Sequence, residues 1–178
     1  MVTTRIGAIN AWLVKTLLAT LVTLTAHAQL LPPNPQIDAS GFLAVTEQAL
    51  LHREQRRVSE QAFLRMSTEP GTVVLDARSS EKFRVMHVKG AINLSFPDIT
   101  AASLARVIPS KQTRVLIYCN NNFSNELGAF PTKLPSSSLN LSTYAALYNY
   151  GYRNVLELGP NVDAKTTKLR LIAAQQLQ

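Results

Sequence analysis

Short apolar runs alternate with stretches of helical periodicity along most of the chain. Four runs are apolar, rich in β-branched residues and bounded by turn-forming or polar residues, which is typical of buried strands: Thr72–Leu75, Val88–Leu94 (interrupted at Gly90), Arg114–Tyr118 and Asn154–Leu158. Apolar residues at helical spacing predict helices over Val45–Arg56, Ser59–Met66, Ile99–Val107, Leu141–Tyr150 and Lys165–Leu177. The expected N-caps of the first four helices are Thr46, Ser59, Thr100 and Asn140.

This alternation predicts the fold class. Strands that are apolar throughout are buried on both faces, and helices between them allow parallel pairing. We therefore expect an α/β protein with a parallel sheet of about five strands and helices on both faces. Ligands of such sheets bind at the carboxyl ends of the strands. Cys119 directly follows Arg114–Tyr118, so it lies at such an end.

The first 28 residues have the pattern of a secretory signal. Arg5 and Lys15 are followed by Thr16–Ala26, which is uncharged and apolar, and Ala26-His27-Ala28 forms a small-x-small cleavage site. An uncleaved anchor is the alternative, but it needs about 20 apolar residues, and Lys15 interrupts such a run. We expect residues 1–28 to be removed, residues 29–44 to form an extended Pro-rich leader and residues 45–178 to form one domain. Such a protein is exported, most simply to the periplasm, without stable membrane insertion.

Composition narrows the class of protein. The 178 residues are 46% hydrophobic and 16% charged, which excludes a disordered charged tail and a collagen-like repeat. Without Arg5 and Lys15 the net charge falls from +7 to +5, too little by itself to indicate a nucleic-acid partner. The one cysteine rules out a disulfide framework. In an exported chain a lone cysteine indicates a reactive thiol or intermolecular pairing, and a buried inert thiol is the alternative.

Several segments together resemble the rhodanese-like domain family. In chain order they are Asp76-Ala77-Arg78, Glu81-Lys82-Phe83, His87-Val88-Lys89-Gly90-Ala91-Ile92-Asn93, Val115-Leu116-Ile117-Tyr118-Cys119 and Gly151-Tyr152-Arg153-Asn154-Val155. The resemblance covers about residues 57–160. It implies a five-stranded parallel α/β fold and a sulfurtransferase in which Cys119 carries sulfur as a persulfide. The implied partners are a small sulfur donor and a thiol or cyanide-like acceptor, with a protein partner left open; no cofactor is expected.

The loop after the cysteine is expected to stabilise a thiolate. Backbone N–H groups that curl around a sulfur form an anion-binding nest without a metal. Asn120, Asn121 and Asn122 follow Cys119, and Asn tolerates the left-handed backbone conformation that such a curl needs. We expect these three residues, with Phe123 and Ser124, to form a cradle of backbone amides; an ordinary polar turn is the alternative.

The chain departs from the family pattern at three places. Catalytic members commonly carry Gly in the loop and a cation five positions after the Cys, where this chain has Ser124. Residues 123–138 separate the loop from the helix that follows it, and in the family that helix directs its N-terminus at the sulfur. Met86 stands where a Gly usually precedes the His. Thiosulfate is therefore expected to be a poor donor, although Lys133 could supply the missing charge.

The other polar residues of the motif are expected to have structural roles. Asp76 and Arg78 are interpreted as anchors of loops through hydrogen bonds, and His87 as a hydrogen-bonding residue rather than a base. No group of His, Cys, Asp and Glu has metal-ligand spacing in the sequence.

Two classes of function remain open. The first is an exported sulfurtransferase with Cys119 as its nucleophile, and the second is a non-catalytic binding or redox-sensing module on the same fold. A phosphatase of related fold would need Arg six residues after the Cys to clamp phosphate, and that residue is Asn125. The phosphatase is thereby excluded.

Overall fold

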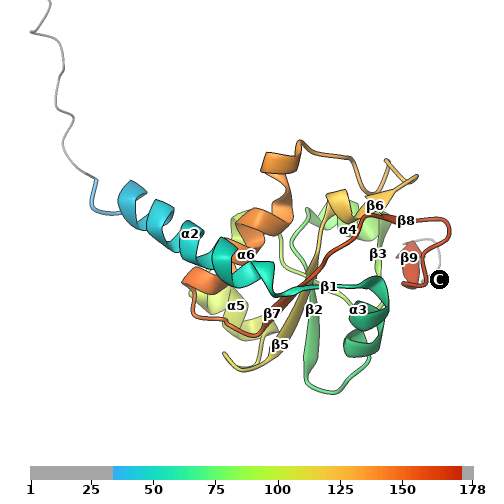
Figure 1. Cartoon of the computed structure of the whole chain (residues 1–178), viewed down its shortest axis with the longest axis horizontal. Helices are drawn as coiled ribbons and strands as arrows, with labels where there is room; N and C mark the ends of the chain where they lie inside the picture. Colours follow the sequence, from blue (N-terminus) through green and yellow to red (C-terminus); the bar gives the residue numbers. More distant parts are fainter. Residues whose placement is uncertain (1–33, 174–178) are drawn as a thin grey trace, which may run out of the picture. The chain divides into compact units, whose positions relative to one another are not determined.

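The computed structural model of the chain describes residues 34–173, which are drawn in colour in Figure 1. The chain divides into two units, residues 1–38 and residues 39–178. In the first unit Asn34–Asp38 form a turn, in which the Ile37 N–H donates to the Asn34 carbonyl at 3.0 Å. The predicted signal and the first five residues of the leader lie outside the described residues. No helix within residues 34–173 is long and apolar enough to cross a membrane.

A five-stranded parallel sheet forms the centre of the second unit. Its strand order is β1–β7–β5–β2–β4, with every neighbouring pair parallel. The strands are β1 (Arg57–Val58), β2 (Thr72–Asp76), β4 (Ile92–Asn93), β5 (Arg114–Tyr118) and β7 (Val155–Leu158). The predicted fold class is confirmed, and β5, the strand that precedes Cys119, is the central one.

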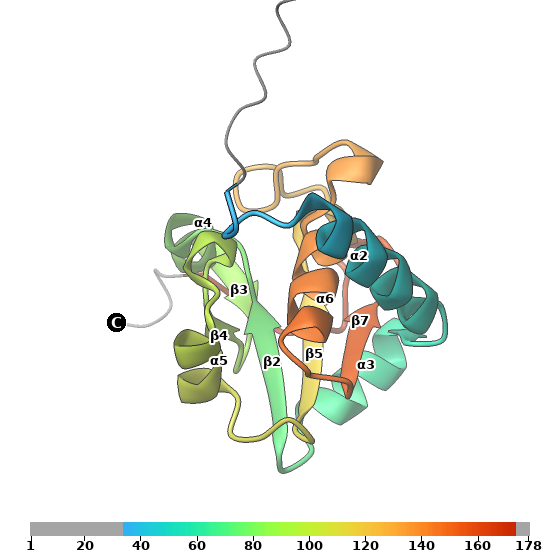
Figure 2. The ribbon, with the colours of Figure 1, turned by 90° about the vertical axis from the view of Figure 1, so that its left-hand side faces the viewer.

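Helices cover both faces of this sheet. They are α2 (Ala39–Glu54), α3 (Glu60–Ser67), α4 (Ser80–Val85), α5 (Ala101–Val107) and α6 (Leu139–Asn149). Because side chains alternate along a strand, β5 contributes Val115 and Ile117 to one core cluster and Leu116 and Tyr118 to the other. The first cluster includes residues of α2, α5 and α6, which lie together over one face in Figure 2. The second cluster includes Phe63 of α3.

Two of the four predicted helix caps are confirmed. The Ser59 hydroxyl accepts the Ala62 N–H at 3.2 Å, and the Thr100 hydroxyl accepts the Ser103 N–H at 3.1 Å. The prediction of Thr46 is wrong, because α2 already begins at Ala39 and residues 39–44 are therefore helical rather than an extended leader. Asp38, which precedes it, is of a type favoured at N-caps.

The cap of α6 also differs from the prediction. Its N-cap is Ser138, and Asn140 lies inside the helix with its side chain buried. The Asn140 amide donates to the side-chain oxygen of Asn122 at 2.9 Å, so this side chain makes a tertiary contact instead of capping the helix. At the other end Gly151 has a φ of +86° and ends the helix, as its position after Tyr150 predicted.

Two small sheets flank the main one. Strand β3 (Met86–Val88) pairs antiparallel with β9 (Leu171–Ala173), and β6 (Phe123–Ser124) pairs parallel with β8 (Val162–Asp163). The predicted helix over Lys165–Leu177 is therefore wrong: Asp163 accepts the Thr167 N–H in a turn, and the apolar residues that follow pair with β3 instead. The predicted interruption at Gly90 is confirmed, because its φ of +82° separates β3 from β4.

Candidate active site

Cys119 lies at the carboxyl end of β5, between the ends of β2 and β7. The residue is only 1% exposed, so its thiol is buried in this structure. The turn η2 (Asn120–Asn122) and the start of α6 adjoin it. The thiol is the one cysteine of the chain and is free.

Two polar groups contact the sulfur. The Asn122 backbone N–H donates both to the Cys119 carbonyl at 3.2 Å and to Sγ, and the Ser138 hydroxyl lies 3.4 Å from Sγ. Ser138 is the N-cap of α6, but its side chain makes no capping hydrogen bond. The N-terminus of an 11-residue helix therefore adjoins the sulfur, although residues 123–138 intervene. A helix N-terminus and hydrogen-bond donors both favour a negative charge on sulfur.

The three asparagines do not adopt the expected left-handed conformation. They form a right-handed 3-10 turn, which the Phe123 N–H closes by donating to the Asn120 carbonyl. Among the described non-Gly residues only Asn125 has a positive φ, of 63°. A 3-10 turn needs no left-handed residue, because its dihedral angles lie close to those of an α-helix.

Instead, the asparagine side chains tie the loop to its neighbours. The Asn122 amide donates to the Leu158 carbonyl at 2.7 Å, and its oxygen accepts the Cys119 N–H at 2.9 Å. Asn121 donates to the Lys133 carbonyl at 2.8 Å and accepts the Lys133 N–H at 3.1 Å. The side-chain oxygen of Asn120 is buried and has no hydrogen-bond partner in the described chain.

Phe123 and Ser124 belong to strand β6 and not to a cradle around the sulfur. Phe123 is 1% exposed and packs edge-on against Tyr118, with 5.8 Å between the ring centroids. The Ser124 hydroxyl donates to the Val162 carbonyl at 3.3 Å. The predicted amide cradle over residues 120–124 is therefore limited to the 3-10 turn, because Phe123 and Ser124 pair with β8.

Part of the stretch of residues 123–138 packs into the core. Ala129 and Phe130 are completely buried, and the ring of Phe130 packs against that of Phe123 at 4.3 Å. The guanidinium carbon of Arg78 lies 4.3 Å from the centroid of the Phe130 ring. Lys133 is exposed, and its contact with the loop is the backbone pairing with Asn121.

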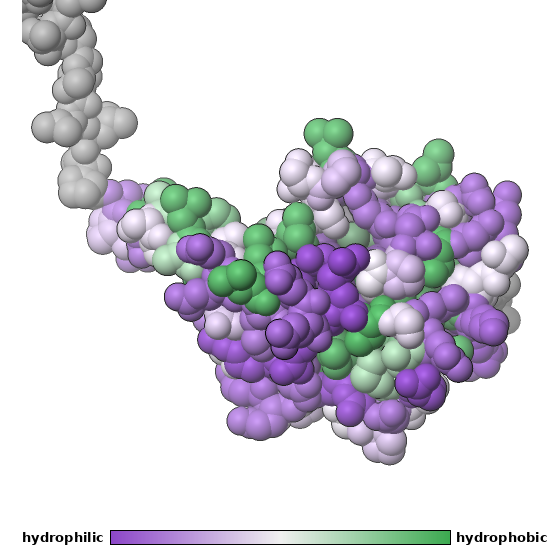
Figure 3. Space-filling view, in the orientation of Figure 1, coloured by the Kyte–Doolittle hydropathy of each residue, from purple (hydrophilic) through white to green (hydrophobic). Residues whose placement is uncertain are grey.

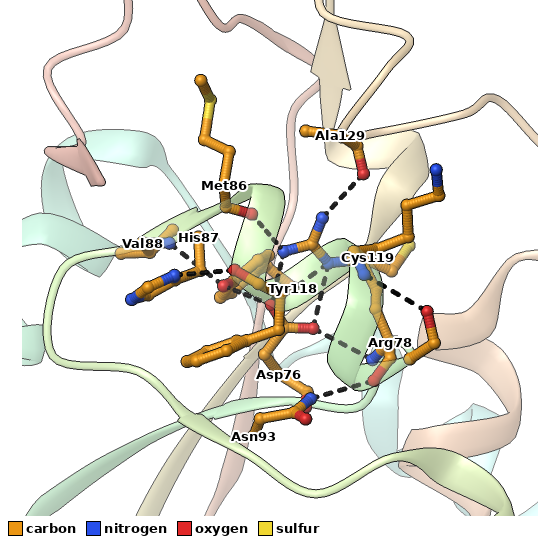
Figure 4. A network of polar contacts seen from close by, with 12 residues as sticks. Asp76, Arg78, Met86, His87, Val88, Asn93, Tyr118, Cys119 and Ala129 are labelled. Carbon is orange, nitrogen blue, oxygen red and sulfur yellow. Dashed lines mark hydrogen bonds and ion pairs between the residues drawn. The ribbon is translucent and has the colours of Figure 1, made fainter. Parts of the chain in front are cut away.

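Asp76 and Arg78 form the buried polar network drawn in Figure 4. Arg78 Nη2 donates to Asp76 Oδ2 at 2.6 Å and to the Met86 carbonyl at 2.8 Å, and Nη1 donates to the Ala129 carbonyl at 2.9 Å. Burial lowers the pKa of Arg78, but the bonds and charge of Asp76 outweigh it and raise this pKa overall. Arg78 therefore stays charged, and its hydrogen bonds hold the end of β2, Met86 and Ala129 together.

Tyr118 completes this network, and the sequence analysis gave it no role. Its hydroxyl donates to Asp76 Oδ2 at 2.6 Å and accepts the Val88 N–H at 3.1 Å. Burial, with the nearby charge of Asp76, raises the pKa of Tyr118 well above its ordinary value, so the phenol keeps its proton. Its position before Cys119, on the same face as Leu116, is the sequence signal that could have identified it.

The side chain of His87 contacts Phe83 of α4. Its Nδ1 lies 2.8 Å from the Phe83 carbonyl, and its ring stacks on that of Phe83 with 3.8 Å between centroids. No group of three or more His, Cys, Asp or Glu among residues 34–173 could hold a metal ion.

Comparisons with known proteins place this geometry in context. The model of the rhodanese-like domain family matches residues 59–158, more than half of the chain. A protein from Bacillus halodurans shares its fold with a TM-score of 0.50, at 17% identity over 74% of this chain and 87% of its own. A rhodanese from E. coli is 23% identical over 57% of this chain and 98% of its own, with a TM-score of 0.39. A thiosulfate sulfurtransferase from Pseudomonas aeruginosa is 20% identical over 74% of this chain and 23% of its own, with a TM-score of 0.47. No curated protein sequence matches the chain.

Proposed function

The chain belongs to the rhodanese-like domain family, and from that membership we propose that it is a sulfurtransferase that carries sulfur as a persulfide on Cys119. One observation carries the proposal: the Cys119 sulfur receives the Asn122 N–H and lies 3.4 Å from the Ser138 hydroxyl at the start of α6. Once Cys119 has lost its proton, both groups can donate to the thiolate, which is the nucleophilic form of a cysteine.

The proposed reaction has two displacement steps. First, the Cys119 thiolate attacks the outer sulfur of a sulfane donor. The Sγ–S bond forms while the donor's bond to that sulfur breaks, and the leaving group departs with the bonding pair. Next, a thiol-type or cyanide-like nucleophile attacks the outer sulfur, and the electrons of the Sγ–S bond return to Cys119 as a thiolate. The two steps balance without an added oxidant or reductant.

The charges around the sulfur bear on the choice of donor. Within residues 34–173 the polar groups in contact with the sulfur are the Asn122 amide and the Ser138 hydroxyl, both uncharged. Ser124, in the position of the usual loop cation, donates its hydroxyl to a backbone carbonyl. An anionic donor such as thiosulfate would lack a counter-charge here, so we expect neutral or apolar sulfane donors to react faster.

A non-catalytic module is the second candidate, and the burial of Cys119 favours it. A thiol that is 1% exposed reacts only when its surroundings open. In that case the fold would serve to bind a protein partner, and Cys119 would be a redox-sensitive or inert thiol.

Whole-protein mass spectrometry distinguishes the two candidates. After incubation of the folded protein with a sulfane donor, the wild type should gain about 32 Da, one sulfur atom. The gain should disappear in Cys119→Ser, since a hydroxyl is a far weaker nucleophile, and on treatment with cyanide. A folded wild type that resists every sulfur donor and every alkylating agent would reject the sulfurtransferase and leave the binding module.

A further inference from the structure

An apolar cavity lies between α2 and α6. Its volume is about 560 Å³, within the range of roughly 300–1,000 Å³ that is typical of small-molecule sites. Its apolar walls come from both helices and from the turn η1 (Phe96–Asp98), and include Phe42, Val45, Leu50, Phe96, Leu141 and Ala145. Neither Cys119 nor any residue of the turn η2 lines it.

Parts of the chain that the family match does not cover build one wall of this cavity. Helix α2, which carries Phe42 and Leu50, precedes the matched residues 59–158. Ser136 also lines the cavity and lies in the stretch that separates the thiol loop from α6. The cavity therefore depends on a helix outside the matched residues and is separate from the thiol.

The lining indicates the chemistry of a ligand. Among the described residues no Asp, Glu, Lys, Arg or His lines the cavity, so a charged ligand would lose its hydration without gaining a counter-charge from them. At the rim Phe42 is 64% exposed, and apolar residues of α2 appear on the molecular surface in Figure 3. Covering such apolar surface is favourable in proportion to the area removed from water.

One polar group in the wall has no partner. The Thr46 hydroxyl is shielded from solvent and makes no hydrogen bond within the described chain. A buried unpaired hydroxyl is costly, and native proteins rarely keep one without a reason. Because Thr occupies two χ1 rotamers in helices, rotation of this side chain would turn the hydroxyl into the cavity, where a ligand with one hydrogen-bonding group would satisfy it.

We propose that this cavity binds an uncharged, largely apolar small molecule with a single hydrogen-bonding group that pairs with Thr46. The site goes beyond sulfur transfer and does not depend on it. Three probes with the same rings test the class of ligand: naphthalene, naphthol and naphthalenesulfonate, each titrated into the purified protein and followed by its fluorescence. Naphthol should bind about three- to tenfold more tightly than naphthalene, as one hydrogen bond gives, and the sulfonate most weakly.

Variants locate the site. Ala146→Phe adds bulk at a half-buried position of the α6 wall and should weaken naphthol binding about tenfold or more. Ala102→Phe makes the same change at an exposed position of α5 outside the cavity and should leave binding unchanged. Thr46→Val should abolish the advantage of naphthol over naphthalene. If Ala146→Phe unfolds the protein, Ser142→Phe obstructs the same wall from an exposed position.

The titrations are repeated in Cys119→Ser, so that the result does not depend on the thiol. Equal binding of naphthol and the sulfonate, or binding that the variants at Ala146 and Ser142 leave unchanged, would overturn the proposal. Naphthol binding without any sulfur transfer would leave the cavity proposal intact and count against the proposed enzyme alone.

Discussion

Ser138 has an unusual position for an N-cap residue, because its hydroxyl contacts the thiol and not the backbone of its own helix. Ser138→Ala removes the hydroxyl that lies 3.4 Å from the Cys119 sulfur and that can donate to its thiolate. We expect alkylation of Cys119 in the folded protein at neutral pH to slow about three- to tenfold, the value of one hydrogen bond. Ser137→Ala is the matched control, since the hydroxyl of this exposed residue makes no contact with the sulfur. Faster alkylation in the Ser138→Ala variant would show instead that the Ser138 side chain blocks access to the thiol.

The ion pair of Asp76 and Arg78 should matter more for stability than for reactivity. Arg78→Met leaves the Asp76 carboxylate buried without its counter-charge and two carbonyls without their donors. Breaking such a buried pair costs about 3–5 kcal/mol, which denaturant unfolding would measure. Arg114→Met, which breaks the exposed pair with Glu69, should cost at most about 1 kcal/mol. Equal losses in the two variants, or an unchanged stability of Arg78→Met with a lost thiol reaction, would contradict the assignment.

Sequence reasoning found the residues of the site that belong to local motifs. Cys119 follows β5, and Asp76 and Arg78 lie at the end of β2, so the parallel topology of the main sheet brings them to one edge. His87 lies in β3, which pairs antiparallel with β9 outside that sheet. Ser138 could not be found in this way. Its contact with Cys119 depends on how the residues between them pack, and that packing is decided by the burial of Phe130.

At the level of elements, the packing of α2 on α6 contains a pH-sensitive contact. His52 Nδ1 lies 2.8 Å from the Tyr144 hydroxyl. Burial raises the pKa of Tyr144 to about 12, so this group stays neutral. Burial lowers the pKa of His52 below its ordinary 6.5, and the charges of Arg56 and Arg153 lower it further.

The sign of the pH effect follows from this direction. Below about pH 6.5 the unfolded chain binds the His52 proton more readily than the folded protein does, so the free energy of unfolding decreases as the pH falls through this value. The decrease continues down to the pKa of the folded state. His52→Gln should make stability less dependent on pH between about 7 and 5 in denaturant unfolding. Parallel profiles of the two proteins would show that His52 does not contribute.

Elements with a regular apolar period were predictable, and those set by tertiary pairing were not. The run Arg114–Tyr118 became β5 with the predicted bounds. Helix α2 begins earlier than predicted because its first turns carry Phe42 and Leu43 on exposed positions, so its start has no amphipathic signature. Leu171–Ala173 form a strand because the edge of β3 accepts them, and that partner lies more than eighty residues away.

At the level of the whole molecule, the predicted signal (residues 1–28) comes before the described fold in the sequence. The described fold begins at Ala39, after the predicted cleavage site. We expect the mature protein to begin at Gln29, because Ala26-His27-Ala28 follows an apolar run too short to span a membrane. N-terminal sequencing of periplasmic material would measure this directly, and a chain lacking residues 1–28 should melt at the same temperature as the exported protein. A chain that keeps Met1 and fractionates with membranes would contradict it.

The outermost pairing of the main sheet joins Arg57 to Glu157, so β1 can dock only after β7 has been synthesised. Such non-local pairing slows folding, because the entropy of closing a long loop is lost before the contacts form. Both β1 and β7 must leave the ribosome before the sheet can close. For a chain that crosses a membrane unfolded, this delay extends the time in which it remains competent for translocation.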